Sequence, residues 1–343
     1  MGHTTDEIQP ARAEAEPATT PVARHAWLPM TLRGLLALVV LAALGHYVAG
    51  LWASEQRQGL TIRWPWALAS VVLYSVGMCQ GAAFWRACMA DMGLRAPWHK
   101  AMAAYWLSQV AKYVPGKAWV VVVRCSAITR EGRDLTPAAA ATFYETLLVM
   151  GVGSAVSLIC FAVAGGDGSN ILVAASAGCV LLFAGVLVPA VFRRLMRTML
   201  LPFPQARGQE VLHCSGRTIA WGVVRGALLW VLLGMSTLAC VNATAPEVAP
   251  VGLLLPLTGG MALATVGGFV VIFMPGGLGV REGLLIAAAT PVIGKAPAGV
   301  AALVVRLLWV FAEVATALGM LAWQKVVEHR RGRVGASASS SPR

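Results

Sequence analysis

The sequence has little charge for its length. Only 12% of its 343 residues are Asp, Glu, Lys or Arg, whereas 58% are hydrophobic. A soluble globular protein carries about 25% charged residues, so this composition excludes an ordinary soluble domain and indicates an integral membrane protein. The apolar runs are continuous rather than alternating, which favours spanning helices over the strands of a membrane barrel.

Signatures of enzymes are also missing. The chain has no Gly-x-Ser-x-Gly, Walker loop, dinucleotide fingerprint or His-Glu-x-x-His, and no polar stretch is long enough for a soluble catalytic domain. The histidines show no metal-ligand spacing. The seven cysteines include no Cys-x-x-Cys, which favours packing roles for the thiols. We therefore expect no enzyme activity, no metal and no cofactor.

The net charge is +12, and most of the excess lies beside apolar runs. These basic residues are Arg193, Arg194, Arg197, Arg207 and Arg217, with Lys325, Arg330, Arg331 and Arg333 near the C-terminus. The positive-inside rule explains this placement, so nucleic-acid binding is not needed to account for it. Attraction to anionic lipid headgroups would follow from the same residues. We expect a protein of the inner or plasma membrane with both termini in the cytoplasm.

Seven apolar segments approach or exceed the roughly 20 residues that cross a bilayer as a helix. They are residues 31–53, 65–89, 136–164, 171–196, 217–241, 249–273 and 297–323. Two further apolar segments are interrupted, at 98–126 and 275–294. The sequence thus predicts an all-α polytopic membrane protein of about seven to eight transmembrane helices. Its membrane domain is expected at 31–325, between disordered tails at 1–30 and 326–343.

Basic residues also predict the topology. The loops expected in the cytoplasm are 90–135 and 193–217, and the basic-poor loops expected outside are 165–170 and 242–248. A cytoplasmic C-terminus requires an even number of crossings. We therefore expect 278–294 to cross the membrane and 98–126 to re-enter from the cytoplasm.

The stretch Met274–Gly283 reads Met-Pro-Gly-Gly-Leu-Gly-Val-Arg-Glu-Gly between two long apolar segments. Proline and four glycines interrupt a helix, and Arg281 with Glu282 adds two charges where charge is costly. Broken backbone at membrane depth is tolerated only where protein or a water-filled cavity covers it. This stretch is therefore a candidate site, with Pro275, Gly276, Gly277 and Gly279 as its flexible backbone.

The break occurs twice. Lys112-Tyr113-Val114-Pro115-Gly116-Lys117 resembles the second break, and each Pro-Gly is followed by an arginine, Arg124 or Arg281. Farther along, Glu145 lies 30 residues after Pro115 and Arg306 lies 31 residues after Pro275. Paired interrupted segments are typical of transporters built from repeats, whose site lies at the repeat interface. The sequence does not distinguish an inverted repeat from a parallel one.

Several charged residues could form a binding site. Arg281 and Arg306, with Lys112, Lys117 and Arg124, suit a phosphate headgroup, although the last three could instead snorkel to the cytoplasmic face. Arg306 lies well inside its apolar helix, so a functional or pairing role is its default. The partners considered are Glu282, Glu313 and Glu145. Glu145 could balance the arginines, orient an amine or take up a proton, whereas Glu313 faces no partner that the sequence identifies. A purely structural ion pair between repeats also stays possible.

These motifs resemble a known family. Tyr113-Val114-Pro115-Gly116-Lys117-x-Trp119, the intramembrane Glu145, and Pro275–Gly283 followed by Arg306 are similar to the flippase-like membrane region of lysylphosphatidylglycerol synthases. The resemblance covers roughly residues 31–325. In full-length synthases this region is thought to move an aminoacylated phospholipid between leaflets, while a soluble domain transfers the amino acid. Because the chain ends soon after its last apolar helix, we expect a single-domain member without synthase activity.

The resemblance implies a lipid-translocating protein with Lys117, Arg124, Glu145, Arg281, Glu282 and Arg306 around its substrate. The lipid would be anionic, aminoacylated or polyprenyl-linked. Three alternatives stay open from the residues. The first is an accessory protein that presents lipid to a glycosyltransferase or other lipid-modifying enzyme. The second is an intramembrane transferase, and the third is a transporter of ions or small metabolites.

Overall fold

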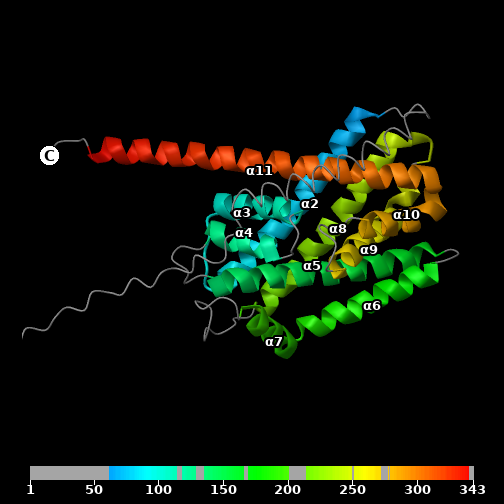
Figure 1. The fold of residues 1–343 in the computed structure, drawn as a ribbon, viewed down its shortest axis with the longest axis horizontal. Coiled ribbons are helices and arrows are strands. Elements are labelled where there is room, and N and C mark those ends of the chain that lie inside the picture. Colours follow the sequence, from blue (N-terminus) through cyan, green and yellow to red (C-terminus); the bar gives the residue numbers. More distant parts are fainter. Residues whose placement is uncertain are drawn as a thin grey trace, which may run out of the picture.

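The computed structural model describes residues 62–113, 118–128, 135–165, 169–200, 214–248, 251–271, 277 and 279–339. Within these residues every regular element is helical (Figure 1). Six of the described helices are long and apolar enough to cross a membrane. The chain is thus a polytopic helical membrane protein, as predicted. The predicted helix at 31–53 lies outside the described residues.

The helices follow the predicted segments closely. The long ones are α2 (Trp64–Asp91), α5 (Leu135–Ala164), α6 (Ser169–Leu187), α8 (Gly216–Thr244), α9 (Leu254–Val270) and α11 (Lys295–Ser339). The short ones are α3 (Trp98–Ala111), α4 (Ala118–Ile128), α7 (Pro189–Leu200) and α10 (Val280–Ile293), with 3-10 turns η3 (Pro246–Val248) and η4 (Val251–Leu253). The described residues include no other helix or turn of this kind.

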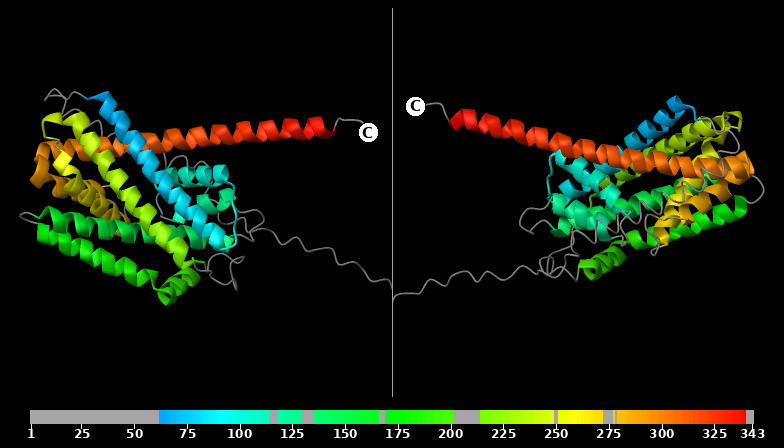
Figure 2. Two further views of the ribbon diagram at one scale, coloured as in Figure 1. Left: turned by 180° about the vertical axis from the view of Figure 1, so that it is seen from behind. Right: turned by 45° about the horizontal axis from the view of Figure 1, so that its top comes forward.

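Two helix ends differ from the prediction. The apolar segment 171–196 is not one helix, because the chain bends at Val188 and Pro189 begins α7. Proline suits the first turn of a helix but cannot continue the preceding one. In contrast, α11 continues to Ser339, into the part of the chain from residue 326 where we expect disorder. No proline interrupts 298–339, and α11 projects beyond the other helices (Figures 1 and 2).

Helices α2 and α8 form an antiparallel pair along the centre of the molecule (Figure 2). At one end, the Arg63 amide donates a hydrogen bond to the Ala243 carbonyl over 2.9 Å. Farther along, the hydroxyls of Ser70 and Ser236 lie 2.9 Å apart. At the opposite end, the Ser215 amide donates to the Asp91 carboxylate. From one end of the pair to the other, the residue numbers of these contacts rise along α2 and fall along α8, so the two helices are antiparallel.

The two halves of the chain have equivalent packing. Exchanging α2 with α8, α3 with α9, α4 with α10 and α5 with α11 converts each major contact of one half into a contact of the other. In particular, α3 packs on α4 as α9 packs on α10, and α5 packs on α9 as α11 packs on α3. Because the central pair α2 and α8 is antiparallel, the halves are arranged as an inverted repeat. Helices α6 and α7 lie outside this correspondence.

Each half contains a helical hairpin at its break. In the second half, a Cβ at Gly260 would lie 2.9 Å from the Cβ of Ala288, and one at Gly268 would lie 3.3 Å from the Cα of Gly277. Such close approach needs small residues, and Gly260, Ala264 and Gly268 recur at four-residue spacing on α9. These contacts make α9 and α10 an antiparallel hairpin that reverses at the second break.

The predicted crossing by 278–294 is therefore wrong for the described helix. Helix α10 has 14 residues and, at about 1.5 Å per residue, is too short for a hydrocarbon core of about 30 Å. Helix α3 also has 14 residues and α4 has 11, so the other interrupted segment is a hairpin of short helices too. The α3 hairpin starts from the Asp91 end of α2, whereas the α9 hairpin starts from the Thr244 end of α8. The two hairpins thus enter the bundle from opposite ends.

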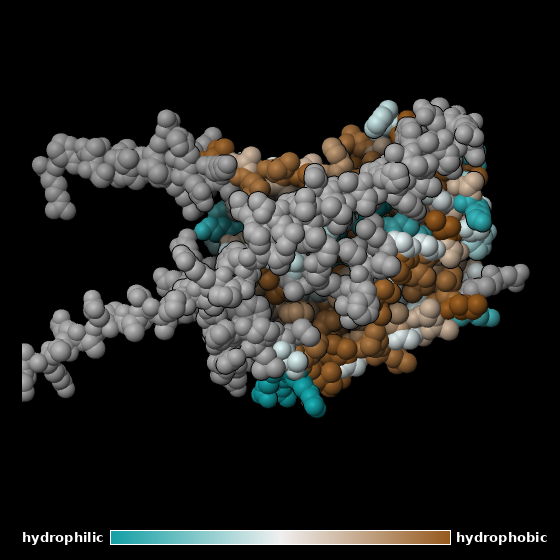
Figure 3. Space-filling view, in the orientation of Figure 1, coloured by the Kyte–Doolittle hydropathy of each residue, from teal (hydrophilic) through white to brown (hydrophobic). Residues whose placement is uncertain are grey.

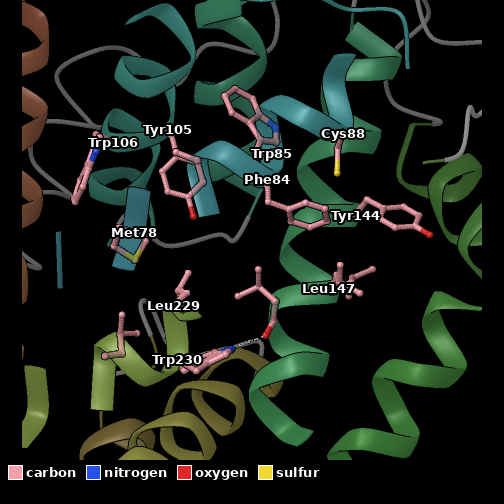
Figure 4. Close-up of a cluster of buried hydrophobic side chains, with 14 of the residues drawn as sticks. Met78, Phe84, Trp85, Cys88, Tyr105, Trp106, Tyr144, Leu147, Leu229 and Trp230 are labelled. Carbon is pink, nitrogen blue, oxygen red and sulfur yellow. Dashed lines mark hydrogen bonds between the residues drawn. The ribbon is translucent and has the colours of Figure 1, made fainter. Parts of the chain in front are cut away.

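An aromatic core fills the space between α2, α3, α5 and α8 (Figure 4). Trp85, Trp106 and Trp230 are fully buried there, and the Trp230 indole donates a hydrogen bond of 2.8 Å to the Val149 carbonyl. Apolar side chains also make up much of the surface that Figure 3 colours, as expected of helices that face lipid. Both observations fit a membrane bundle with an apolar interior and an apolar outer surface.

Cysteine cross-linking tests the inverted arrangement. In a variant without its native cysteines, Ser70→Cys with Ser236→Cys should form a disulfide under mild oxidation, because the two hydroxyls are already in contact. The measurement is the mobility shift of the intact chain, or of the chain cut by protease between the two sites. The control pair, Ser70→Cys with Val223→Cys, places the second thiol near the start of α8. Cross-linking of the control pair alone would indicate a parallel arrangement.

Candidate functional site

Two clusters of charged side chains lie inside the bundle, one in each half. The first cluster centres on Arg124 of α4 and Glu145 of α5, which are both almost completely buried. Arg124 Nη1 lies 2.6 Å from Glu145 Oε2, and Arg124 Nε donates to the Ser108 hydroxyl over 2.8 Å. The Tyr105 hydroxyl donates to the other carboxylate oxygen over 3.1 Å. The pair is therefore neutral and hydrogen-bonded on both sides.

Aromatic rings complete this first cluster. The Arg124 guanidinium lies over the Tyr105 ring, 4.1 Å from its centroid, and near the Trp85 ring at 5.2 Å. Trp85 and Tyr105 are close to each other in the same part of the core (Figure 4). Stacking on ring faces stabilises a guanidinium that has lost its water. Because its charges and hydrogen-bond donors already have partners, the first cluster leaves few groups with which a ligand could bind.

The second cluster begins where α10 starts. Gly279 has a positive φ of 80°, which allows the chain to leave the break and enter the helix. The Glu282 carboxylate accepts a hydrogen bond of 2.7 Å from the Gly279 amide, which caps the helix N-terminus. The other Glu282 oxygen lies 3.7 Å from Arg306 Nε on α11. Of the partners considered for Arg306, Glu282 is thus the one that pairs with it.

Glu313 of α11 is the most buried carboxylate of the second cluster, with a relative exposure of 0%. It accepts hydrogen bonds from Lys112 at the end of α3 and from the hydroxyl of Tyr74 on α2. The expectation that Glu313 lacks an identifiable partner is wrong, because both partners come from distant parts of the sequence. A single carboxylate thus connects the first break to the long helix of the second half.

Arg281 has a different environment from the other buried arginines. Its guanidinium lies over the Trp309 ring, 4.5 Å from the centroid, and donates to the Met261 sulfur over 3.4 Å. The side chain is 8% exposed, and within the described part of the chain it forms no ion pair. A thioether and an indole ring do not neutralise a full charge. Arg281 therefore leaves a buried positive charge for another group to match.

The ends of the two hairpins meet at the second cluster. The Tyr113 ring lies 5.1 Å from the Arg306 guanidinium, and Lys112 lies within electrostatic range of Arg281 and Arg306. Residues of the first break therefore contact charged residues that follow the second break. Since the hairpins enter from opposite ends, this meeting point lies inside the bundle and not at either end.

The predicted site residues divide between the two clusters. Arg124 and Glu145 form the first, whereas Arg281, Glu282 and Arg306 belong to the second, with Gly277 and Gly279 at its backbone. The predicted residues Pro115, Gly116, Lys117, Pro275 and Gly276 lie outside the described residues.

Sequence reasoning missed several members of the second cluster. Tyr74 and Trp309 stack with ring centroids 4.4 Å apart, and Tyr74 also holds Glu313. Neither residue was chosen, because an aromatic side chain in an apolar helix has no distinctive pattern. Lys112 was considered for phosphate binding but not for an ion pair with Glu313. The sequence did contain one signal, because the acidic residue Glu313 lies two turns after Arg306 in the same apolar helix.

Removal of one charge from the first cluster should destabilise the protein more than removal of both. Glu145→Leu leaves Arg124 buried without its anion, which costs about 3–5 kcal/mol, whereas an apolar pair of similar volume is often neutral. We therefore expect Glu145→Leu to lower the melting temperature by several degrees. The double variant Arg124→Met/Glu145→Leu should recover most of that loss. Thermal unfolding in detergent, followed by size-exclusion chromatography, measures both. Equal melting temperatures for all three proteins would show that the pair is not structural.

Comparison with known proteins places the chain in a family. The family model that matches is the lysylphosphatidylglycerol synthase transmembrane region, over residues 26–317. The matched region contains both charged clusters and both breaks. Comparisons with curated proteins and with solved structures give no match. The family implies a membrane protein related to lipid modification. Because the model covers most of the sequence, the chain belongs to the family of the lysylphosphatidylglycerol synthase transmembrane region.

Proposed function

We propose that the protein binds the phosphate of an anionic lipid at the second cluster and moves that lipid between the leaflets. The observation that supports this most strongly is the buried Arg281 guanidinium, which has no carboxylate partner among the described residues. A phosphate would supply the missing negative charge. Arginine is well suited to it, because its planar fork donates two parallel hydrogen bonds.

The neighbours of Arg281 fit this role. Arg306 supplies a second guanidinium within electrostatic range of Arg281, and Lys112 lies within the same range as a third positive charge. Glu282 and Glu313 balance part of this charge, and each already holds one of the cations. In the proposal, the carboxylates keep the cations oriented and prevent binding so tight that the lipid cannot leave.

The hairpin arrangement suggests how both leaflets could reach one site. The α3 hairpin enters the bundle from one end and the α9 hairpin from the other, and their ends meet at the second cluster. We infer that each is a re-entrant hairpin that acts as the gate on its own side. Glycine at positions 277 and 279, with Pro275 and Gly276, would supply the flexible backbone of one gate, and Pro115 and Gly116 that of the other. This follows the general pattern of transporters with a central site between inverted repeats.

Membership of the family supports a lipid as the ligand, because the family model describes a membrane region of lipid-modifying proteins. We propose transport rather than chemistry for this region. The described clusters are dominated by arginines and by carboxylates that already have partners. Lys117 would receive the headgroup on the cytoplasmic side. Arg124 and Glu145, predicted to contact the lipid, are instead proposed to maintain the fold of the first half.

A translocation assay tests this proposal. The purified protein is reconstituted into liposomes with fluorescent phosphatidylglycerol, aminoacylated phosphatidylglycerol or a polyprenyl phosphate, and the rate of leaflet exchange is measured by dithionite quenching. We expect exchange above the protein-free rate with at least one anionic lipid. Arg281→Ala should lower that rate at least about tenfold, because one lost charge-assisted hydrogen bond is worth about 1.5–3 kcal/mol.

Matched control variants distinguish an effect on the binding site from an effect on folding. Arg225→Gln removes an arginine that bonds Gln80 outside both clusters, so it should leave the exchange rate unchanged. Arg281→Lys keeps the charge but loses the fork and should retain intermediate activity. If no lipid exchanges faster than in protein-free liposomes while lipid still co-purifies with wild type and not with Arg281→Ala, translocation is wrong. The accessory, lipid-presenting role then replaces it.

A further inference from the structure

Helix α7 has a one-sided distribution of charge. Its exposed residues include Arg193, Arg194 and Arg197, and its twelve residues include no acid. Its opposite face holds Phe192 and Met196, which are both fully buried. The Phe192 ring packs edge-on against Tyr144 of α5, with centroids 4.9 Å apart. One face is thus attached to the bundle while the basic face points outward.

The position of α7 is at one end of the bundle. The chain bends at Val188, and α7 departs from the direction of α6 (Figure 1). Hydrophilic atoms gather at the lower edge of the surface, where α7 lies (Figure 3). Two apolar side chains near its start, Val188 and Val191, remain 47% exposed. An exposed apolar edge beside an arginine face is typical of a helix that lies in the headgroup layer.

Other exposed arginines lie at the same end. The bond between Asp91 and the Ser215 amide places the segment after α2 beside the start of α8, and Arg95 and Arg217 are exposed in these segments. No ion pair involves any of the five arginines within the part of the chain that the structure describes. Their charges are therefore available to an external anion.

We propose that α7 is an interfacial helix that binds the anionic lipid headgroups of one leaflet. Its basic face complements a surface rich in phosphatidylglycerol, and its exposed valines reach the acyl boundary below. A bilayer fits better than an acidic protein partner, because α7 connects directly to α6, an apolar helix long enough to span a membrane. By the positive-inside rule, this leaflet is the cytoplasmic one. The proposal does not depend on lipid transport.

Fluorescence quenching tests this inference. A fluorophore is attached at Thr198→Cys, an exposed position on α7, in a variant without native cysteines. The full-length chain is placed in nanodiscs of phosphatidylcholine with a fixed small fraction of headgroup-nitroxide phosphatidylglycerol or phosphatidylcholine. We expect the labelled phosphatidylglycerol to associate with α7 at least about fivefold more strongly at low salt. High salt should reduce this preference, because exposed charges are screened.

The triple variant Arg193→Gln/Arg194→Gln/Arg197→Gln should lose the preference while keeping the wild-type melting temperature, since all three side chains are exposed. The matched control, Arg63→Gln/Lys295→Gln, removes two exposed cations at the opposite end of the bundle and should keep it. Equal quenching by the two labelled lipids in the wild type would overturn the proposal. So would a preference that survives in the triple variant, or quenching absent with both lipids, which would mean that α7 lies away from the bilayer.

Discussion

Buried charge is the constraint on which the rest of this structure depends. A charged side chain inside a membrane bundle is costly unless another charge or a polar group matches it. Six arginine and glutamate side chains in the described residues are almost completely buried: Arg124, Arg281, Arg306, Glu145, Glu282 and Glu313. Most of them are matched across helices rather than within one. The pairs therefore fix how the helices of each half pack, in addition to the apolar contacts between them.

The two halves each contain a buried ion pair, but the cation and the anion come from opposite helices in the two halves. In the first, the short helix after the break supplies the cation Arg124 and the long helix supplies the anion Glu145. In the second, the short helix supplies the anion Glu282 and the long helix supplies the cation Arg306. The second half then adds Arg281, which pairs with no carboxylate among the residues that the structure describes. The two halves have equivalent helices but unequal charge. The first half contains a neutral ion pair, whereas the second half contains an ion pair and one additional positive charge.

This inequality gives the molecule one candidate site rather than two. The surplus charge lies where the ends of the two hairpins meet, so movement of either hairpin alters the surroundings of Arg281. Lys112 and Glu313 connect the first break to α11, which couples the halves at that point. The basic face of α7 lies apart from this site, at the end of the bundle. In our proposal, this face holds the protein against an anionic leaflet.

Much of the fold could be predicted from the sequence. Long apolar runs predict where the described long helices begin to within a few residues, because a membrane leaves the backbone few other ways to satisfy its hydrogen bonds. The Pro-Gly pairs located both breaks, and the spacing of Arg124, Glu145, Arg281 and Arg306 indicated the repeat.

The remaining features depend on contacts between distant segments. The inverted arrangement rests on pairs such as Ser70 with Ser236, which no local pattern reveals. For the same reason the partners of Glu313 were missed, since Tyr74 and Lys112 lie 239 and 201 residues away along the chain. The crossing expected for 278–294 came from the even number of crossings that a cytoplasmic C-terminus requires, and that number does not show where the chain reverses. Gly260, Gly267 and Gly268 bring α10 back along α9.

The most direct test of the central claim is the location of a bound lipid phosphorus atom. Solid-state NMR can measure dipolar coupling between phosphorus and guanidinium nitrogen in the arginine-labelled protein, reconstituted with an anionic lipid that binds it. The measurement is made in the Arg193→Gln/Arg194→Gln/Arg197→Gln background, which removes the headgroup contacts proposed for α7. There the account predicts a short phosphorus-to-nitrogen contact that is strongly reduced when Arg281→Lys is added. Absence of that contact in the background, or its full persistence after Arg281→Lys, would contradict the account.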